Sequence, residues 1–159
     1  MEISVIIESE QMKRVGFGKM RIIGVDFGDA RVGIAASDSL GVTAQGLDTL
    51  HEKNMERVID HLCSLAKELS ATEFVVGLPK NMNGTIGERG IRTQQFAKLL
   101  EEKSRLRVKL WDERLTSAAA HSVLAEGNVS GKKRAGAVDK IAAIMILQGY
   151  MQSKNNGGI

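Results

Sequence analysis

The apolar residues of this chain fall into two kinds of segment: short runs typical of strands, and longer stripes with helical spacing. Two runs separated only by Gly28-Asp29-Ala30 predict a tight antiparallel hairpin. A continuous apolar run that ends at Pro79 is typical of a central parallel strand buried on both faces. We therefore expect strands at residues 21–28, 31–37, 42–50, 74–78 and 106–111.

Helices are expected between and after these strands. Apolar stripes with helical periodicity cover Met55 to Leu69 and Ile91 to Lys103. Thr116 is a suitable N-cap for a helix that extends to about Glu126. A last helix is expected from Ala137 to about Met151, after a flexible basic loop at residues 131–136. This order of elements predicts an α/β fold with a central mixed five-stranded sheet, its first three strands antiparallel, flanked by helices.

The length and the apolar content favour one folded domain. With 159 residues and 43% hydrophobic residues, the chain can bury one sizeable core, which we expect over residues 20–152. Residues 1–19 alternate poorly and are interpreted as an N-terminal extension, and residues 153–159 as a flexible tail. No segment has the length of a membrane span, so we expect no membrane partner.

The amino-acid composition places only weak limits on the kinds of binding partner. The chain carries 22 Lys and Arg against 19 Asp and Glu, a net charge of +3 that is compatible with a polyanionic partner without requiring one. A single cysteine excludes a disulfide framework and a cysteine-rich zinc site, and a reducing cytoplasm is the simplest compartment. Aromatic residues make up only 4%, so a nucleic acid would be recognised through its backbone and shape more than by base stacking.

Asp26 is the most informative residue, because a carboxylate is disfavoured inside an apolar strand. Glu113, just past the last expected strand, and Asp139, in the last expected helix, also lie in apolar settings. Ligands of open α/β sheets gather at the carboxyl ends of the strands, where these three acids could meet. An oxygen-only site of this kind suits Mg²⁺ or Mn²⁺, and two such ions can clamp the oxygens of a phosphodiester for hydrolysis.

Each of these residues also has a simpler interpretation. Asp29 fits a turn residue, and Asp112 could cap or orient rather than bind, because it and Glu113 would face opposite sides of an extended strand. For Asp139, a helix N-terminal acid that interacts with the macrodipole is an equal alternative. The basic triplet of the expected loop could be solvated or could contact phosphates; its members are Lys132, Lys133 and Arg134.

Four motifs in this order resemble the RuvX/YqgF family: GVDFGDARVGIA at residues 24–35, VGLPKNMNGT at 76–85, DERLTS at 112–117, and VDKIAA with ILQ at 138–148. Members of that family look like Holliday junction resolvases and are described as nucleases that process the 5′ end of pre-16S ribosomal RNA. The resemblance implies an RNase H-like fold, with Asp26, Glu113 and Asp139 as catalytic metal ligands. It also implies that Arg31 and Arg114 assist substrate binding.

The chain departs from the family pattern at two positions. Asn83 stands where the family loop commonly has aspartate, and Ser117 where it commonly has threonine. Neither is a proposed ligand, so these departures concern substrate fit rather than metal chemistry. The expected function is a metal-dependent endonuclease of structured RNA, as a monomer or homodimer, with branched DNA as the alternative substrate.

The sequence leaves two other classes of function as alternatives. A nucleic-acid-binding module without cleavage would not need the three acids. An ATP-binding domain of the actin and sugar kinase type would need a second lobe and a second aspartate-glycine phosphate loop, which the sequence lacks.

Overall fold

The first two strands form the hairpin that the sequence predicts. The computed structural model describes residues 21–113 and 131–155, and in it β1 (Arg21–Phe27) pairs antiparallel with β2 (Arg31–Ser37). The backbone N–H of Gly28 donates to the carbonyl oxygen of Arg31 over 3.0 Å and closes the turn. Asp29 lies in this turn, as expected.

The strands form one mixed sheet in the order β3-β2-β1-β5-β6, with β4 pairing with β2. β5 (Ala71–Leu78) lies between β1 and β6 (Arg107–Asp112) and is parallel to both. The expected α/β fold with a mixed sheet is confirmed. The carboxyl ends of β1, β5 and β6 therefore lie at one edge of the sheet.

The single third strand predicted over residues 42–50 is wrong. It is two short strands, β3 (Ala44–Gly46) and β4 (Leu50–His51), which pair antiparallel with different parts of β2, so the sheet has six strands in the described residues. Between them the Thr49 hydroxyl donates to the carbonyl oxygen of Gly136 over 3.0 Å. This contact with the last helix, together with Asp48, a residue depleted in strands, explains the interruption.

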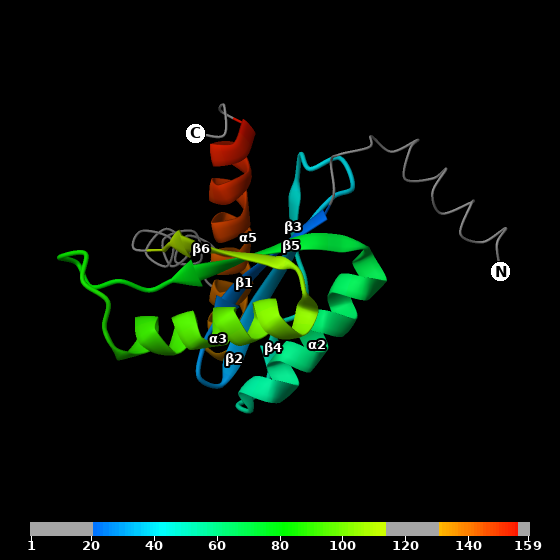
Figure 1. The fold of residues 1–159 in the computed structure, drawn as a ribbon. Coiled ribbons are helices and arrows are strands. Elements are labelled where there is room, and N and C mark those ends of the chain that lie inside the picture. Colours follow the sequence, from blue (N-terminus) through cyan, green and yellow to red (C-terminus); the bar gives the residue numbers. More distant parts are fainter. Residues whose placement is uncertain (1–20, 114–130, 156–159) are drawn as a thin grey trace, which may run out of the picture.

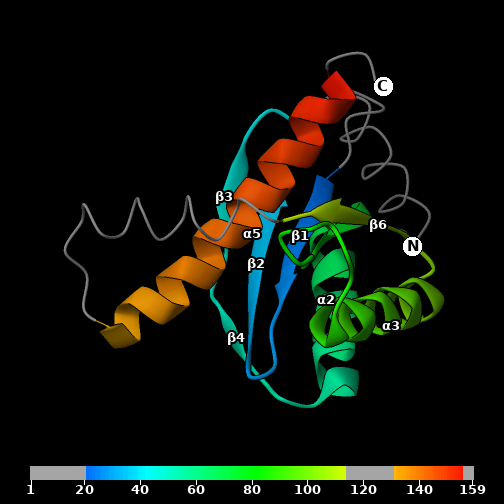
Figure 2. The same cartoon turned by 90° about the vertical axis from the view of Figure 1, so that its left-hand side faces the viewer.

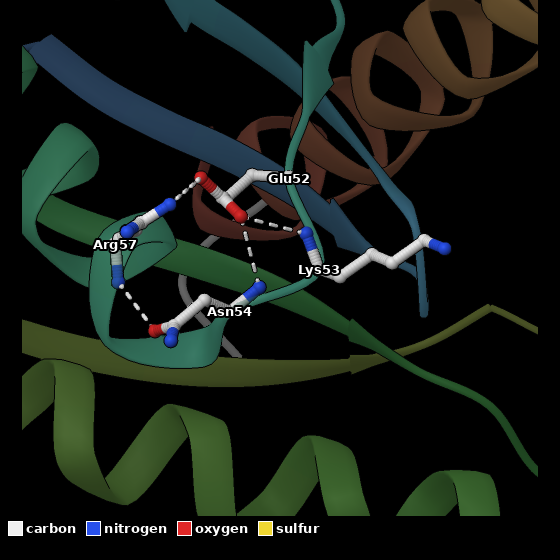
Figure 3. A network of polar contacts seen from close by, with 4 residues as sticks. All are labelled: Glu52, Lys53, Asn54 and Arg57. Carbon is white, nitrogen blue, oxygen red and sulfur yellow. Dashed lines mark hydrogen bonds and ion pairs between the residues drawn. The ribbon is translucent and has the colours of Figure 1, made fainter.

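Two helices cover one face of the sheet: α2 (Met55–Leu69) and α3 (Glu88–Ser104), as Figures 1 and 2 show. The bounds predicted for α2 are confirmed, and its start is fixed by a polar network (Figure 3). The Asn54 side chain accepts from the backbone N–H of Arg57, and Glu52 accepts from the N–H groups of Lys53 and Asn54. These bonds satisfy amide groups that a helix N-terminus otherwise leaves without partners.

The opposite face is crossed by one long helix, α5 (Gly131–Asn155) (Figure 2). The flexible loop predicted at residues 131–136 is therefore wrong, and the helix continues to Asn155, three residues into the predicted tail, of which residues 156–159 lie outside the described part of the chain. Lysine, arginine and alanine are good helix formers, and one glycine inside a helix costs only about 1 kcal/mol. Asp139 lies two turns inside the helix, so the macrodipole interpretation of this residue is also wrong.

The sheet thus lies between two apolar layers. Side chains of β1 alternate between them: Ile23, Val25 and Phe27 pack with α2 and α3, whereas Ile22 packs with α5. Gly24 lies directly under Leu147 of α5, so Asp26, two residues further on, faces the same side.

Two expectations fall outside the described residues: the helix from Thr116 to Glu126 and the N-terminal extension. Among the helices described, none is both long enough and apolar enough to cross a membrane.

Candidate functional site

Asp26 and Glu113 lie at the same edge of the sheet. Asp26 is the penultimate residue of β1, and Glu113 directly follows β6. The backbone N–H of Glu113 donates to the carbonyl oxygen of Leu78, the last residue of β5, over 3.3 Å. This bond holds the chain after β6 against the sheet, where Glu113 can reach across β5 toward Asp26.

Two glycines flank Asp26 on the neighbouring strands. Gly33 of β2 is its antiparallel partner, and the register that pairs Val25 with Val76 places Gly77 of β5 on its other side. A Cβ atom at Gly33 would overlap the carbonyl oxygen of Asp139, and a Cβ atom at Gly77 would overlap the carboxylate of Glu113. The missing side chains therefore allow both acidic residues to approach the sheet beside Asp26.

The carboxyl groups of Asp26 and Glu113 are hydrogen-bonded to each other. Burial and the nearby charge of Asp139 raise the pKa of Asp26 from 3.8 to about 6, although the hydrogen bond with Glu113 lowers it in part. Burial and the charge of Asp26 raise the pKa of Glu113 from 4.5 to about 8. Arg89, in the first turn of α3, lowers both pKa values but does not offset the increase. At neutral pH the two carboxyl groups share one proton.

Asp139 is close to this pair but is bound to a different residue. Its Oδ2 atom accepts from Nε of Arg31 over 2.7 Å, while its charge contributes to the raised pKa of Asp26. The structure therefore brings Asp26 and Glu113 into contact and places Asp139 beside them in an ion pair. Across residues 21–113 and 131–155, no three histidine, cysteine, aspartate or glutamate side chains are arranged as a set of metal ligands.

The donor chemistry of this site nevertheless fits a magnesium-like ion. Mg²⁺ usually binds to one or two carboxylates and completes its shell with water and substrate phosphates, so it does not need three protein ligands. Asp26 and Glu113 offer only oxygen atoms, and burial together with the charges of neighbouring acids makes them hold a proton that a cation could replace. The residues present therefore suit Mg²⁺ or Mn²⁺ better than zinc.

Several cationic side chains surround this edge, and sequence reasoning found only some of them. The side chain of Arg31 is 43% exposed although it is bound to Asp139. Lys80 lies 3.8 Å from Asp112, and Arg92 lies 3.3 Å from Asp29 and over the ring of Phe27. Lys80, Arg89 and Arg92 were missed, although their position just after β5 and at the start of α3 is a signal for this edge.

The side chains of five residues that the sequence relates to substrate binding or substrate fit are not placed. Arg114 and Ser117 lie outside the described residues. For Lys132, Lys133 and Arg134 the structure describes the helical backbone at the start of α5 but no side chains. Figure 2 shows that the first turns of α5 extend beyond the edge of the sheet. The roles of Arg114, Lys132, Lys133 and Arg134 in substrate binding stay predictions.

Comparisons with solved structures identify the fold. RuvC of Thermus thermophilus, in a complex with a Holliday junction substrate, is similar with a TM-score of 0.55 over 87% of this chain and 97% of that chain, at 12% identity. The yeast mitochondrial Holliday junction resolvase Ydc2 has a TM-score of 0.54 over 92% of this chain and 85% of that chain, at 10% identity. The predicted RNase H-like fold is thereby confirmed.

Proteins found by sequence comparison share a much higher identity with this chain than the solved structures do. A Bacillus cytotoxicus protein named "Putative pre-16S rRNA nuclease" is 52% identical over 138 residues, which cover 85% of this chain and all of the relative. A Clostridium novyi protein with the same name is 48% identical over 134 residues, 84% of this chain and 99% of the relative. The family model described as "RuvX: Holliday junction resolvase" matches residues 20–153. This chain therefore belongs to the RuvX family of resolvase-like nucleases.

Proposed function

We propose that this protein is a metal-dependent endonuclease that hydrolyses phosphodiester bonds during 5′-end processing of pre-16S ribosomal RNA in the cytoplasm. The observation that carries the proposal is the Asp26–Glu113 pair, two carboxyl groups that share a proton at the carboxyl edge of the sheet. A protein does not need such a pair for stability, because burial disfavours both charges. The names of the relatives support ribosomal RNA as the substrate.

Each acidic and basic group then has a role. Asp26 and Glu113 would hold Mg²⁺ or Mn²⁺, with Asp139 as a third ligand once it leaves Arg31. A bound divalent ion would polarise the phosphate and activate water. Arg31 would bind a substrate phosphate in place of Asp139 and orient the backbone beside the carboxylates. Arg114, Lys132, Lys133 and Arg134 would extend the same phosphate contacts.

Branched DNA is the second candidate substrate. It is favoured by the family description and by the fold shared with two resolvases. The chemistry at the carboxylates would be the same for both substrates, so the two candidates differ in the shape of nucleic acid that the surrounding cations accept.

A cleavage assay decides between these candidates. Purified protein would be given a 5′-extended precursor of 16S ribosomal RNA and a four-way DNA junction side by side, with Mg²⁺, with Mn²⁺ or with EDTA. We expect metal-dependent cleavage of the RNA and weaker or no cleavage of the junction. Preferential cleavage of the junction would support the second candidate, and the absence of metal-dependent cleavage of either would contradict the proposed chemistry.

Matched variants connect the activity to the site. We expect Asp26→Asn to abolish cleavage while the protein stays folded, because the variant loses a metal ligand but also loses repulsion within the site. Glu102→Gln, at an exposed position of α3, is the control for the loss of one carboxylate and should cleave like the wild type. Full activity of Asp26→Asn would refute the assignment.

A further inference from the structure

Met82 is a large apolar side chain that lies almost completely in solvent. It is 87% exposed, the highest value among the large apolar residues that the structure describes as exposed. Met82 belongs to the loop between β5 and α3, residues 79–87, which protrudes from the sheet in Figure 1. Two further exposed apolar side chains, Ile86 and Ile91, lie at the end of this loop and at the start of α3.

Hydrogen bonds that do not involve the Met82 side chain hold the loop in a defined turn. The N–H of Asn81 donates to the carbonyl oxygen of Thr85, and the N–H of Gly84 donates to the carbonyl oxygen of Asn81, both over 2.8 Å. The Asn83 side chain accepts from both the N–H and the hydroxyl of Thr85. Gly84 has a φ of 85°, which only glycine adopts without strain. Polar groups therefore fix the turn and hold Met82 outward.

This turn lies within reach of the carboxylate site. The loop follows Leu78, whose carbonyl oxygen accepts from the N–H of Glu113, and the four residues from Leu78 to Met82 span at most about 14 Å. Lys80, next to Asp112, lies at the base of the loop, and Arg92, which is 44% exposed, lies just beyond its end. An apolar tip flanked by cations is complementary to a nucleic acid, whose phosphates are anionic and whose base faces are apolar.

We propose that Met82 is a wedge that packs against unstacked bases next to the scissile phosphate and selects substrates in which base pairing is interrupted. This inference rests on the proposed function. A methionine side chain is flexible and polarisable, which suits packing against bases of any sequence. Inserted apolar side chains, including methionine, are a common means by which proteins exploit weak points in base stacking. The scarcity of aromatic residues makes such a contact more important in this chain.

Binding measurements without cleavage test the wedge separately from the chemistry. An RNA hairpin with a single-stranded junction, carrying 2-aminopurine at the first unpaired position, would be titrated with protein in EDTA. A fully paired RNA duplex of equal charge is the second probe. The variants are Met82→Ser, Met82→Leu, and Val42→Ser as a control for the loss of an apolar side chain that is 66% exposed in another loop.

We expect Met82→Ser to bind the junction RNA about fivefold more weakly while its affinity for the duplex is unchanged, which corresponds to loss of one base contact. The 2-aminopurine signal should change with the wild type and with Met82→Leu but much less with Met82→Ser. Val42→Ser should behave like the wild type. Equal weakening for both RNAs, or unchanged affinity for the junction, would overturn the proposal.

Two further outcomes distinguish the wedge from related ideas. If the wild type selects the junction RNA through Met82 but cleaves no nucleic acid with metal, the wedge is supported and the proposed function fails. If sedimentation shows that Met82→Ser converts a dimer to a monomer without changing RNA selectivity, Met82 serves contact between copies of this chain and the wedge is refuted.

Discussion

Replacing Glu113 with glutamine tests the proton that we place between Glu113 and Asp26. Glu113 binds its proton more tightly in the folded protein, where its pKa is about 8, than in the unfolded chain, where it is near 4.5. Between these two pH values the folded state binds more protons than the unfolded state. The free energy of unfolding of the metal-free protein should therefore fall as the pH rises through this window.

The magnitude follows from the size of the shift. One pKa unit corresponds to about 1.4 kcal/mol, so full ionisation of Glu113 in the folded protein would cost about 5 kcal/mol. Glu113 is partly exposed and shares its proton with Asp26, so we expect roughly half of this value. Glutamine carries no charge in either state and can still donate a hydrogen bond to Asp26. Glu113→Gln should be about 2 kcal/mol more stable than the wild type at pH 8 and nearly equal at pH 4.5.

Urea unfolding in EDTA at the two pH values measures this difference. At pH 8 the variant should also unfold about 4 to 8 °C higher, as expected for a domain of this size. Added Mg²⁺ should stabilise the wild type more at pH 8 than at pH 5, because the metal replaces a proton, and should stabilise the variant little. Glu102→Gln is again the control. A stability difference that does not change with pH would refute the shared proton.

Four further predictions test other parts of the structure. Gly33→Ala should destabilise the protein by about 1 to 3 kcal/mol, because the new Cβ atom would overlap the backbone of Asp139. Gly136 has open space around it, so Gly136→Ala should stabilise the protein by about 0.5 to 1 kcal/mol. Urea unfolding measures both effects. Tyr150→Phe should cost about 1 to 3 kcal/mol in the same assay, because the Tyr150 hydroxyl donates to the buried carboxylate of Glu73. Arg31→Ala should weaken binding of structured RNA at low salt, since we assign Arg31 to a phosphate, without loss of fold by circular dichroism. Neutralising the basic triplet should flatten the salt dependence of RNA binding by roughly 0.7 to 0.9 per lost phosphate contact, and an unchanged slope would contradict the phosphate role of Lys132, Lys133 and Arg134.

The strands and helices that pack on the core were predictable from sequence because their apolar patterns reflect burial directly. The helix from Met55 to Leu69 was predicted to the residue, and the hairpin around Asp29 follows from its turn residues. The start of α5 was not predictable in the same way. Its first residues carry charges and glycines, a pattern that a flexible loop and a solvated helical turn share.

The candidate site was predictable in part. Asp26 is conspicuous within an apolar strand, and the topology brings Glu113 to the same edge. The contact between the two carboxyl groups, by contrast, depends on Gly33 and Gly77, which have no side chains on neighbouring strands. Sequence patterns do not show which residues lie opposite each other across a sheet. Arg89 and the ion pair between Arg31 and Asp139 were missed for the same reason.

The protein buries carboxylates under α5 at two places, and the charges are compensated to different degrees at the two places. At one, Glu73 accepts hydrogen bonds from the Tyr150 hydroxyl and, over 2.9 Å, from Nζ of Lys154, so its charge is paired with a cation. At the other, Asp26 and Glu113 keep raised pKa values despite Arg89, because both are buried, the charge of Asp139 opposes ionisation of Asp26, and the charge of Asp26 opposes ionisation of Glu113. The same helix that supplies Tyr150 and Lys154 to Glu73 supplies Asp139, a further acid, to Asp26. A fold that can neutralise a buried carboxylate has therefore compensated this pair only in part, through Arg89, which is the arrangement expected if a cation binds there as we propose.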